Sequence, residues 1–368
     1  MSKQEKQEKK KKKHTALIII LIVVGVILLT IAGIGLMIYL KLAKMSRNAT
    51  PIDVNNPLQV PEVIEQPEMD LIPVEDYSKI DLTEDYDIDI EDIDIGEWGE
   101  PTNEPIQYTP HHNSNIINIL LVGNDQREGQ HDHGRSDTMI LLSFNRTART
   151  AKLVSFLRDT WVYIPGRNKW NRINTAYFFG GIGMMINTIN YNFNLDIQKY
   201  MRVDFNNLRY IVDSLGGIDI YLTEREIDYI NANTASHLPR EAGIHHLNGL
   251  QTLRHARNRS IGGDGDWSRT RRQRDILYAM LNKIKQQPSV YDLYNLVDSM
   301  LAHVDTNLTP GECADLAGDF IFGNEVMLAN RAVPFEGTWQ YAWEGRMAVI
   351  KIDIAANRAK LHQYLYGG

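Results

Sequence analysis

Three short apolar segments, rich in β-branched residues, constrain the fold of this 368-residue chain more than any other feature of its sequence. They span residues 118–122, 138–144 and 151–156, and each has the length and composition of a buried strand. A short polar turn, 145–150, separates the second segment from the third. Consecutive strands joined in this way pair antiparallel, so we expect a meander. The end of the first strand, the start of the second and the end of the third then share one edge of the sheet.

Charged residues flank all three strands at this predicted edge: Asp125, Arg135, Asp137, Arg158 and Asp159. Two carboxylates and several guanidinium groups at one edge suit a hard divalent cation together with a phosphorylated ligand. We therefore take this edge of the sheet as the candidate functional centre.

A second set of arginines lies in the first turn of a predicted helix. At 100° per residue, Arg269, Arg272 and Gln273 project from one face of that turn. Arg271 and Arg274 are expected on the far side. Cations in a first turn oppose the helix dipole, whereas an anion bound there would meet both the dipole and the guanidinium groups. The pattern favours an anion site, and the alternative is a solvated basic face paired with acids.

The N-terminal part of the chain predicts a membrane anchor. A lysine-rich tail, 1–14, precedes a stretch without charged residues, 15–40, which is long enough to span a bilayer as a helix. Its length exceeds the apolar core of a cleavable signal peptide, so we expect an uncleaved anchor. The denser positive charge before the span places the N-terminus in the cytoplasm and everything after it outside. This orientation argues against nucleic acid as the partner of the arginines.

Residues 41–110 form an acidic linker in this reading. Residues 51–100 carry seventeen acidic residues and one lysine, Lys79, so the net charge of −7 belongs to the linker and not to the domain that follows. An extended, self-repelling spacer explains this composition, and a calcium site is the alternative. The single cysteine, Cys313, excludes an internal disulfide.

Residues 115–368 have the composition of one globular domain. Beyond the meander, the pattern predicts helices at 176–190, 206–215, 249–257, 268–286, 290–301, 310–321 and 355–366. It predicts further strands at 200–203, 218–222, 326–332 and 347–352. This order implies a mixed α/β fold, with a sheet covered by helices.

Seven motifs, in order, resemble the LytR-CpsA-Psr family. They are Leu-Leu-Val-Gly-Asn-Asp-Gln-Arg, Gly-Arg-Ser-Asp-Thr-Met, Val-Ser-Phe-Leu-Arg-Asp-Thr, Arg-Ile-Asn-Thr-Ala-Tyr, Asp-Ser-Leu-Gly-Gly-Ile, His-Leu-Asn-Gly-Leu-Gln and Ala-Arg-Asn-Arg. The resemblance implies single-pass cell-membrane enzymes with an extracellular catalytic domain. Such enzymes move an anionic glycopolymer, such as wall teichoic acid or capsule, from an undecaprenyl-pyrophosphate carrier to a hydroxyl of peptidoglycan. The resemblance also implies a twisted central mixed sheet flanked by helices, with an apolar pocket for the polyprenyl tail beside the phosphate site.

The same resemblance assigns roles to individual residues. It makes Asp125 and Asp137 the ligands of Mg²⁺, with Mn²⁺ as the alternative ion. It makes the pyrophosphate-binding set Arg135, Arg158, Arg257, Arg259, Arg269 and Gln273. From this set and its neighbours we expect Arg158, Asp159 and Arg135 to be catalytic.

Some alternatives stay open at this point. A lipid-pyrophosphate hydrolase would use the same groups with water as the nucleophile, and a non-catalytic wall-polymer or polyprenyl-phosphate binding protein would keep the basic site. Asp125 and Asp159 are both candidates for the general base, and Asp159 is also suited to pair with a nearby arginine. The run 131–133, His-Asp-His, is interpreted as part of a loop over the site, with a zinc site as its alternative.

Overall fold

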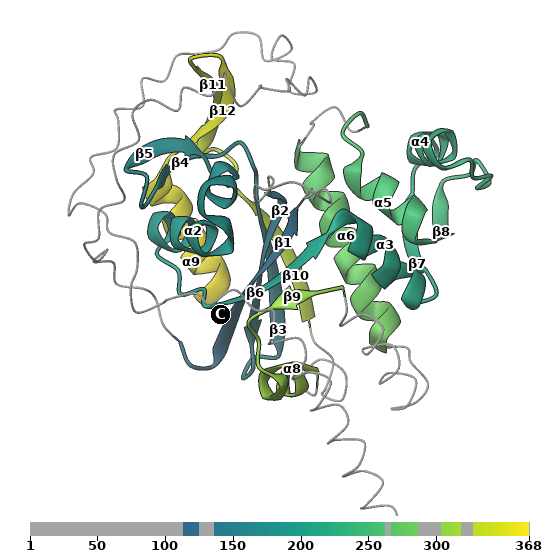
Figure 1. The fold of residues 1–368 in the computed structure, drawn as a ribbon, viewed down its shortest axis with the longest axis horizontal. Coiled ribbons are helices and arrows are strands. Elements are labelled where there is room, and N and C mark those ends of the chain that lie inside the picture. The colour runs from purple at the N-terminus through teal and green to yellow at the C-terminus, as the bar shows by residue number, and fades with distance from the viewer. Residues whose placement is uncertain (1–112, 125–135, 262–265, 286–302, 318–326, 368) are drawn as a thin grey trace, which may run out of the picture.

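A six-stranded mixed sheet lies at the centre of the molecule (Figure 1). The computed structural model describes residues 113–124, 136–261, 266–285, 303–317 and 327–367. Within them the strand order of the sheet is β10-β3-β2-β1-β6-β9. The strands are β1 (Ile116–Asn124), β2 (Ser136–Asn145), β3 (Thr150–Phe156), β6 (Lys199–Asp204), β9 (Asp305–Thr306) and β10 (Met327–Val333).

The predicted meander is confirmed. Strand β1 pairs antiparallel with β2, and β2 pairs antiparallel with β3. Gly123 lies opposite Thr138, and Ile140 lies opposite Ser155, so the three strand ends meet at one edge. Strand β6 adds to β1 in parallel, which brings its C-terminal end to the same edge. The sheet thus places the ends of four strands around one site.

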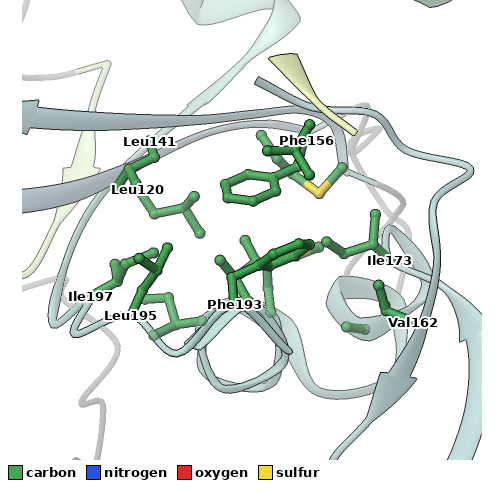
Figure 2. Close-up of a cluster of buried hydrophobic side chains, with 14 of the residues drawn as sticks. Leu120, Leu141, Phe156, Val162, Ile173, Phe193, Leu195 and Ile197 are labelled. Carbon is green, nitrogen blue, oxygen red and sulfur yellow. The ribbon is translucent and has the colours of Figure 1, made fainter. Parts of the chain in front are cut away.

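One face of the sheet carries the largest core cluster. It is covered by α2 (Thr175–Phe193) and α9 (Ile354–Tyr366) (Figure 1). Figure 2 shows Leu120, Leu141 and Phe156 pointing from the strands toward Phe193 of α2, and the rings of Phe156 and Phe193 lie 5.1 Å apart. Burial of each such ring contributes roughly 1.5–3 kcal/mol. This face holds the sheet rigid beneath the site.

Helices α3 (Phe205–Ser214), α4 (Glu224–Thr234), α5 (Gly249–Arg257) and α6 (Asp266–Lys285) lie on the other side of the sheet in Figure 1. With the ribbon of β7 (Ile218–Leu222) and β8 (Gly243–Leu247) they enclose a second apolar cluster. Helix α6 contacts β2, β3 and β10 and also packs against β7 and α5. It therefore joins the helical layer to the sheet. Helix α8 (Pro310–Ala317) closes a third, smaller cluster.

Two antiparallel ribbons complete the described fold: β4 (Trp161–Ile164) with β5 (Lys169–Arg172), and β11 (Trp339–Glu344) with β12 (Met347–Ile352). Sequence patterning missed β4, β5, β8, β9, β11 and α4. The five strands are only two to six residues long, too short for a clear period. The predicted helix 290–301 lies outside the described residues.

No helix among the described residues is long and apolar enough to cross a membrane. The span predicted at 15–40 lies outside those residues, as do the lysine-rich tail and the acidic linker. The membrane anchor thus stays a prediction.

Candidate functional site

Asp137 is the centre of the site. It is the second residue of β2, and its carboxylate meets guanidinium groups from three separate parts of the chain. Arg158 Nη1 lies 3.0 Å from Oδ1, Arg259 Nη2 lies 3.3 Å from Oδ2, and Arg269 Nη1 lies 3.8 Å from Oδ1. Arg269 also donates to the Asp137 backbone carbonyl at 3.2 Å. One carboxylate thus gathers three cations.

The charged residues of this cluster shift one another's pKa values. Burial by itself raises the pKa of Asp137, but the charges of Arg269, Arg158 and Arg259 outweigh it and lower that pKa to about 2. Burial likewise disfavours the charged form of Arg158, yet the neighbouring aspartates hold its pKa above the ordinary value. Asp137 and Arg158 are therefore both ionised at neutral pH.

The backbone around Arg158 is held in place by the end of the sheet. Leu157 N–H donates to the Val333 carbonyl of β10 at 3.0 Å, and Asn174 N–H donates to the Arg158 carbonyl at 3.3 Å. Asp159 Oδ2 lies 3.4 Å from Arg158 Nε, and its Oδ1 lies 3.3 Å from Arg172 Nη1. Asp159 therefore lies between two arginines and orients the Arg158 fork toward Asp137.

Asp266 is a site residue that sequence reasoning missed. It begins α6 and pairs with Arg269 three residues later, and its Oδ1 lies 3.9 Å from Arg158 Nε. An acidic residue in a first turn is favoured by the helix dipole. Its position three residues before Arg269 was the signal that could have identified it.

The described groups leave a positive excess. Arg158, Arg172, Arg259 and Arg269 face Asp137, Asp159 and Asp266, which amounts to four cations and three anions. Guanidinium forks match the geometry of phosphate oxygens and bind them through paired hydrogen bonds. The arrangement is therefore suited to a phosphorylated ligand.

The other predicted site residues do not all lie in this cluster. Gln273 is buried one turn along α6 from Arg269. Arg257 is exposed at the C-terminal end of α5. Asp125 and Arg135 lie outside the described residues, as does the run 131–133.

Two arginines of α6 differ from expectation. Arg272, predicted on the same face as Arg269, donates from Nε to Glu226 at 2.8 Å and from Nη1 to the Asn258 carbonyl at 2.9 Å. Arg274, predicted on the far side, is buried and donates from Nη1 to Ser155 Oγ at 2.6 Å. Helix α6 packs on the sheet and on the helical layer, so arginines on more than one of its faces are buried.

The residues present fit a hard divalent cation in part. Among the described residues, no group of three or more His, Cys, Asp or Glu is placed to hold a metal ion. Asp137 supplies one ionised carboxylate, which is the ligand type that Mg²⁺ prefers. Mg²⁺ takes only one or two carboxylates when phosphate oxygens complete its shell, so Asp137 is compatible with the predicted ion.

The model of the LytR_cpsA_psr family matches residues 93–353. The chain belongs to this family. The expected family membership is therefore confirmed, and with it the mixed α/β fold whose central sheet is flanked by helices.

Similar proteins include polyisoprenyl-teichoic acid–peptidoglycan teichoic acid transferases. The one from Bacillus anthracis, TagU, is 31% identical over 207 residues, which cover 56% of this chain and 65% of that protein. The one from Bacillus mycoides is 32% identical over the same coverage. The match thus spans slightly less than two thirds of the curated relatives' length.

Solved structures share the fold. TagT bound to LIIa-WTA aligns with a TM-score of 0.58 at 22% identity, covering 69% of this chain and 91% of that one. Bacillus subtilis TagV aligns with a TM-score of 0.55 at 24% identity, covering 69% and 98%. TagT with bound octaprenyl pyrophosphate lipid aligns with a TM-score of 0.53 at 21% identity, covering 68% and 91%.

Proposed function

We propose that this protein is a phosphotransferase that moves a phosphate-linked glycopolymer from a polyprenyl-pyrophosphate carrier to a hydroxyl of peptidoglycan. The names of its curated relatives support this reaction, and TagT, which shares its fold, has been solved with such lipids bound. The observation that carries the proposal is the single carboxylate of Asp137 among Arg158, Arg259 and Arg269.

The reaction exchanges a phosphoanhydride bond for a phosphoester bond. The oxygen of an acceptor hydroxyl attacks the sugar-bearing phosphorus, the bond from that phosphorus to the bridging oxygen breaks, and polyprenyl phosphate leaves with the electron pair. The proton of the hydroxyl passes to solvent as the new ester bond forms. Guanidinium groups placed around the pyrophosphate stabilise the charge that moves onto the leaving oxygen.

Individual residues have separable tasks in this scheme. Arg158 is held on two sides, since Asp137 and Asp159 each contact it. We assign it to the transferred phosphate. Asp159, which also contacts Arg172, positions Arg158 instead of taking the proton.

Asp137 and Asp125 would hold Mg²⁺, or Mn²⁺ in its place. When bound, the ion supplies neutralisation of the two phosphates. Arg259 and Arg269, which share Asp137 in the described structure, would then donate to the phosphate oxygens. Arg135, next to Ser136 at the start of β2, would join this set.

The proposal includes a location. The lysine-rich tail 1–14 would lie in the cytoplasm, and the uncharged run 15–40 would span the cell membrane. The domain 115–368 would then meet its lipid-linked substrate at the outer surface.

The test uses the full chain in detergent micelles with Mg²⁺, a synthetic polyprenyl-pyrophosphate saccharide and uncrosslinked glycan strands. Mass spectrometry follows attachment of the saccharide phosphate. We expect attachment by the wild type, none after chelation of the metal, and none by Asp137→Asn. Arg240→Ala is the matched control, because Arg240 forms an exposed ion pair with Asp228 elsewhere on the surface.

Two other results would overturn the proposal. Release of polyprenyl phosphate without any acceptor product identifies a hydrolase. Tight binding of donor by a chain that never turns over identifies a binding protein.

A further inference from the structure

A groove of about 440 Å³ lies apart from the arginine site. The exposed face of the β7–β8 ribbon forms one wall, and one stripe of α6 forms the other. The wall residues used below are Asp219, Tyr221 and Ile244 from the ribbon and Asp275, Tyr278 and Asn282 from α6. Figure 1 places this ribbon and α6 together, on the side of the sheet away from α2 and α9.

The groove gathers the exposed apolar side chains of the molecule. Five large hydrophobic side chains are exposed in the described part of the chain, and three of them line this groove. Tyr221 is 64% exposed, Ile244 76% and Tyr278 48%. Tyr221 and Ile244 are direct cross-strand partners and so share one face of the ribbon. This concentration on one surface makes the groove a candidate ligand site.

Polar groups between these side chains are available to a ligand. Among the described residues, none forms a hydrogen bond with the side chains of Tyr221, Tyr278 or Asn282. Asp219 is held at one end of the ribbon by His246, whose Nδ1 lies 2.8 Å from Asp219 Oδ1. Aromatic rings beside carboxylate and amide groups suit a sugar, because its C–H face packs on a ring while its hydroxyls reach the polar groups.

The charge of the groove selects among polymers. Its walls carry the carboxylates of Asp219 and Asp275 and one ammonium group, that of Lys283. The arginine site has the opposite sign. A polymer of phosphodiesters is repelled by the groove and attracted to the arginines, whereas an uncharged glycan meets no penalty in the groove.

The position of the groove relates it to the arginine site through α6. Asp275 follows Arg269 by six residues, which is about 9 Å along the helix axis. At 100° per residue, Asp275, Tyr278 and Asn282 lie on the opposite side of α6 from Arg269. A strand lying in the groove therefore runs beside the helix whose first turn carries the phosphate site, and only the part of the strand that extends beyond the groove would reach that site.

We infer that this groove binds an uncharged glycan strand and holds the acceptor polymer next to the transfer site. The acceptor role rests on the proposed function. Glycan binding itself does not, because it follows from the rings, the polar groups and the charge of the groove.

The experiment titrates the full chain in detergent with neutral β-1,4-linked N-acetylglucosamine oligosaccharides and measures heat or ligand NMR line broadening, with no donor present. Tyr221→Ala with Tyr278→Ala lowers affinity about tenfold or more, as expected for the loss of two stacking rings. Asn282→Ala weakens binding through the polar contacts alone. Tyr210→Ala is the control, since Tyr210 is 52% exposed but lies outside the groove.

Three outcomes overturn the inference: no binding by the wild type, equal loss with Tyr210→Ala, or a tyrosine-dependent affinity for lipid vesicles in place of the oligosaccharide. Arg158→Ala separates this inference from the proposed function. If oligosaccharide binding depends on the tyrosines while transfer does not depend on Arg158, the groove stands and the phosphotransferase assignment fails. If transfer depends on Arg158 and the tyrosines change nothing, the groove fails alone.

Discussion

Two arginines on one helix, Arg269 and Arg272, have opposite surroundings. Arg269 shares the carboxylate of Asp137 with two other guanidinium groups at the end of the sheet. Arg272, three residues later, is the only arginine paired with Glu226 in the described structure, and its other nitrogens donate to the carbonyls of Asn258 and Ile261.

The difference lies in how completely each charge is matched. Glu226 also caps α4 by accepting from the Thr223 backbone N–H at 3.0 Å, so the Arg272 cluster ties three segments together with no positive excess. The Asp137 cluster has more donors than one carboxylate can accept. A saturated cluster stabilises the fold, and an unsaturated one is able to bind an anion.

The largest expected effect tests the unsaturated cluster. Arg158→Ala removes the guanidinium nearest to Asp137 and should lower the transfer rate by roughly 10³–10⁵, as for other arginines at phosphoryl-transfer sites. Single-turnover transfer measured by mass spectrometry checks the rate. Turnover close to that of the wild type would contradict the assignment of Arg158.

A substitution in the saturated cluster should instead lower the stability of the fold. Arg272→Ala leaves Glu226 buried without its partner, and we expect the free energy of unfolding to fall by about 3–5 kcal/mol. Urea titration measures this loss, and the transfer rate per folded molecule should hardly change. Arg240→Ala, which breaks an exposed ion pair, should cost under about 1 kcal/mol. Equal losses in the two variants would show that the Arg272 cluster stabilises the fold no more than an exposed ion pair does.

His255 makes the saturated cluster sensitive to pH. Burial lowers the pKa of this histidine to about 4, against the opposing influence of Glu226. The unfolded chain therefore binds a proton between about pH 6.5 and pH 4 that the folded chain does not, so stability falls as the pH falls through this window. We expect a loss of roughly 2 kcal/mol between pH 7 and pH 5.

Urea titrations of the wild type and His255→Gln at the two pH values measure this slope, which should flatten in the variant. The contribution of Asp137 is lost only at lower pH, between about 3.8 and 2, because its pKa is lowered. A wild-type slope unchanged by the substitution would mean that another group is responsible.

The smallest expected effect is a gain in anion affinity when a residue of the site is replaced. Asp137→Asn removes one negative charge from among three guanidinium groups, so the metal-free chain should bind inorganic pyrophosphate roughly tenfold more tightly, since a charge at this range is worth on the order of 1–4 kcal/mol. Added Mg²⁺ should increase the pyrophosphate affinity of the wild type, but it should leave the affinity of the variant unchanged. Calorimetry with and without the metal measures both. Weaker metal-free binding by the variant would show that Asp137 is not competing with the anion.

Sequence patterning predicted the part of the site that depends on local order. Asp137 and Arg158 were placed together because the meander follows from strand periodicity and one short turn. The helix 249–257 was predicted with its observed bounds, and in the structure a capping box of Asn248 and Gln251 fixes its start.

The remainder depends on contacts between distant segments. Arg272 points away from the site because it pairs with Glu226, which lies 46 residues earlier in the chain. Arg274 is buried because β3 supplies Ser155, 119 residues away. Helical periodicity indicates which residues share a face, but it does not indicate how many faces will be covered.

The parallel pairing of β10 with β3 also has a kinetic consequence. Met327 pairs with Thr150 across 177 residues of chain, and the same pairing lets Leu157 donate to Val333 just before Arg158. Contacts of such long range form slowly, because the entropy of closing a large loop must be overcome first. The turn that carries Arg158 is therefore expected to settle among the last steps of folding, after the local meander has formed.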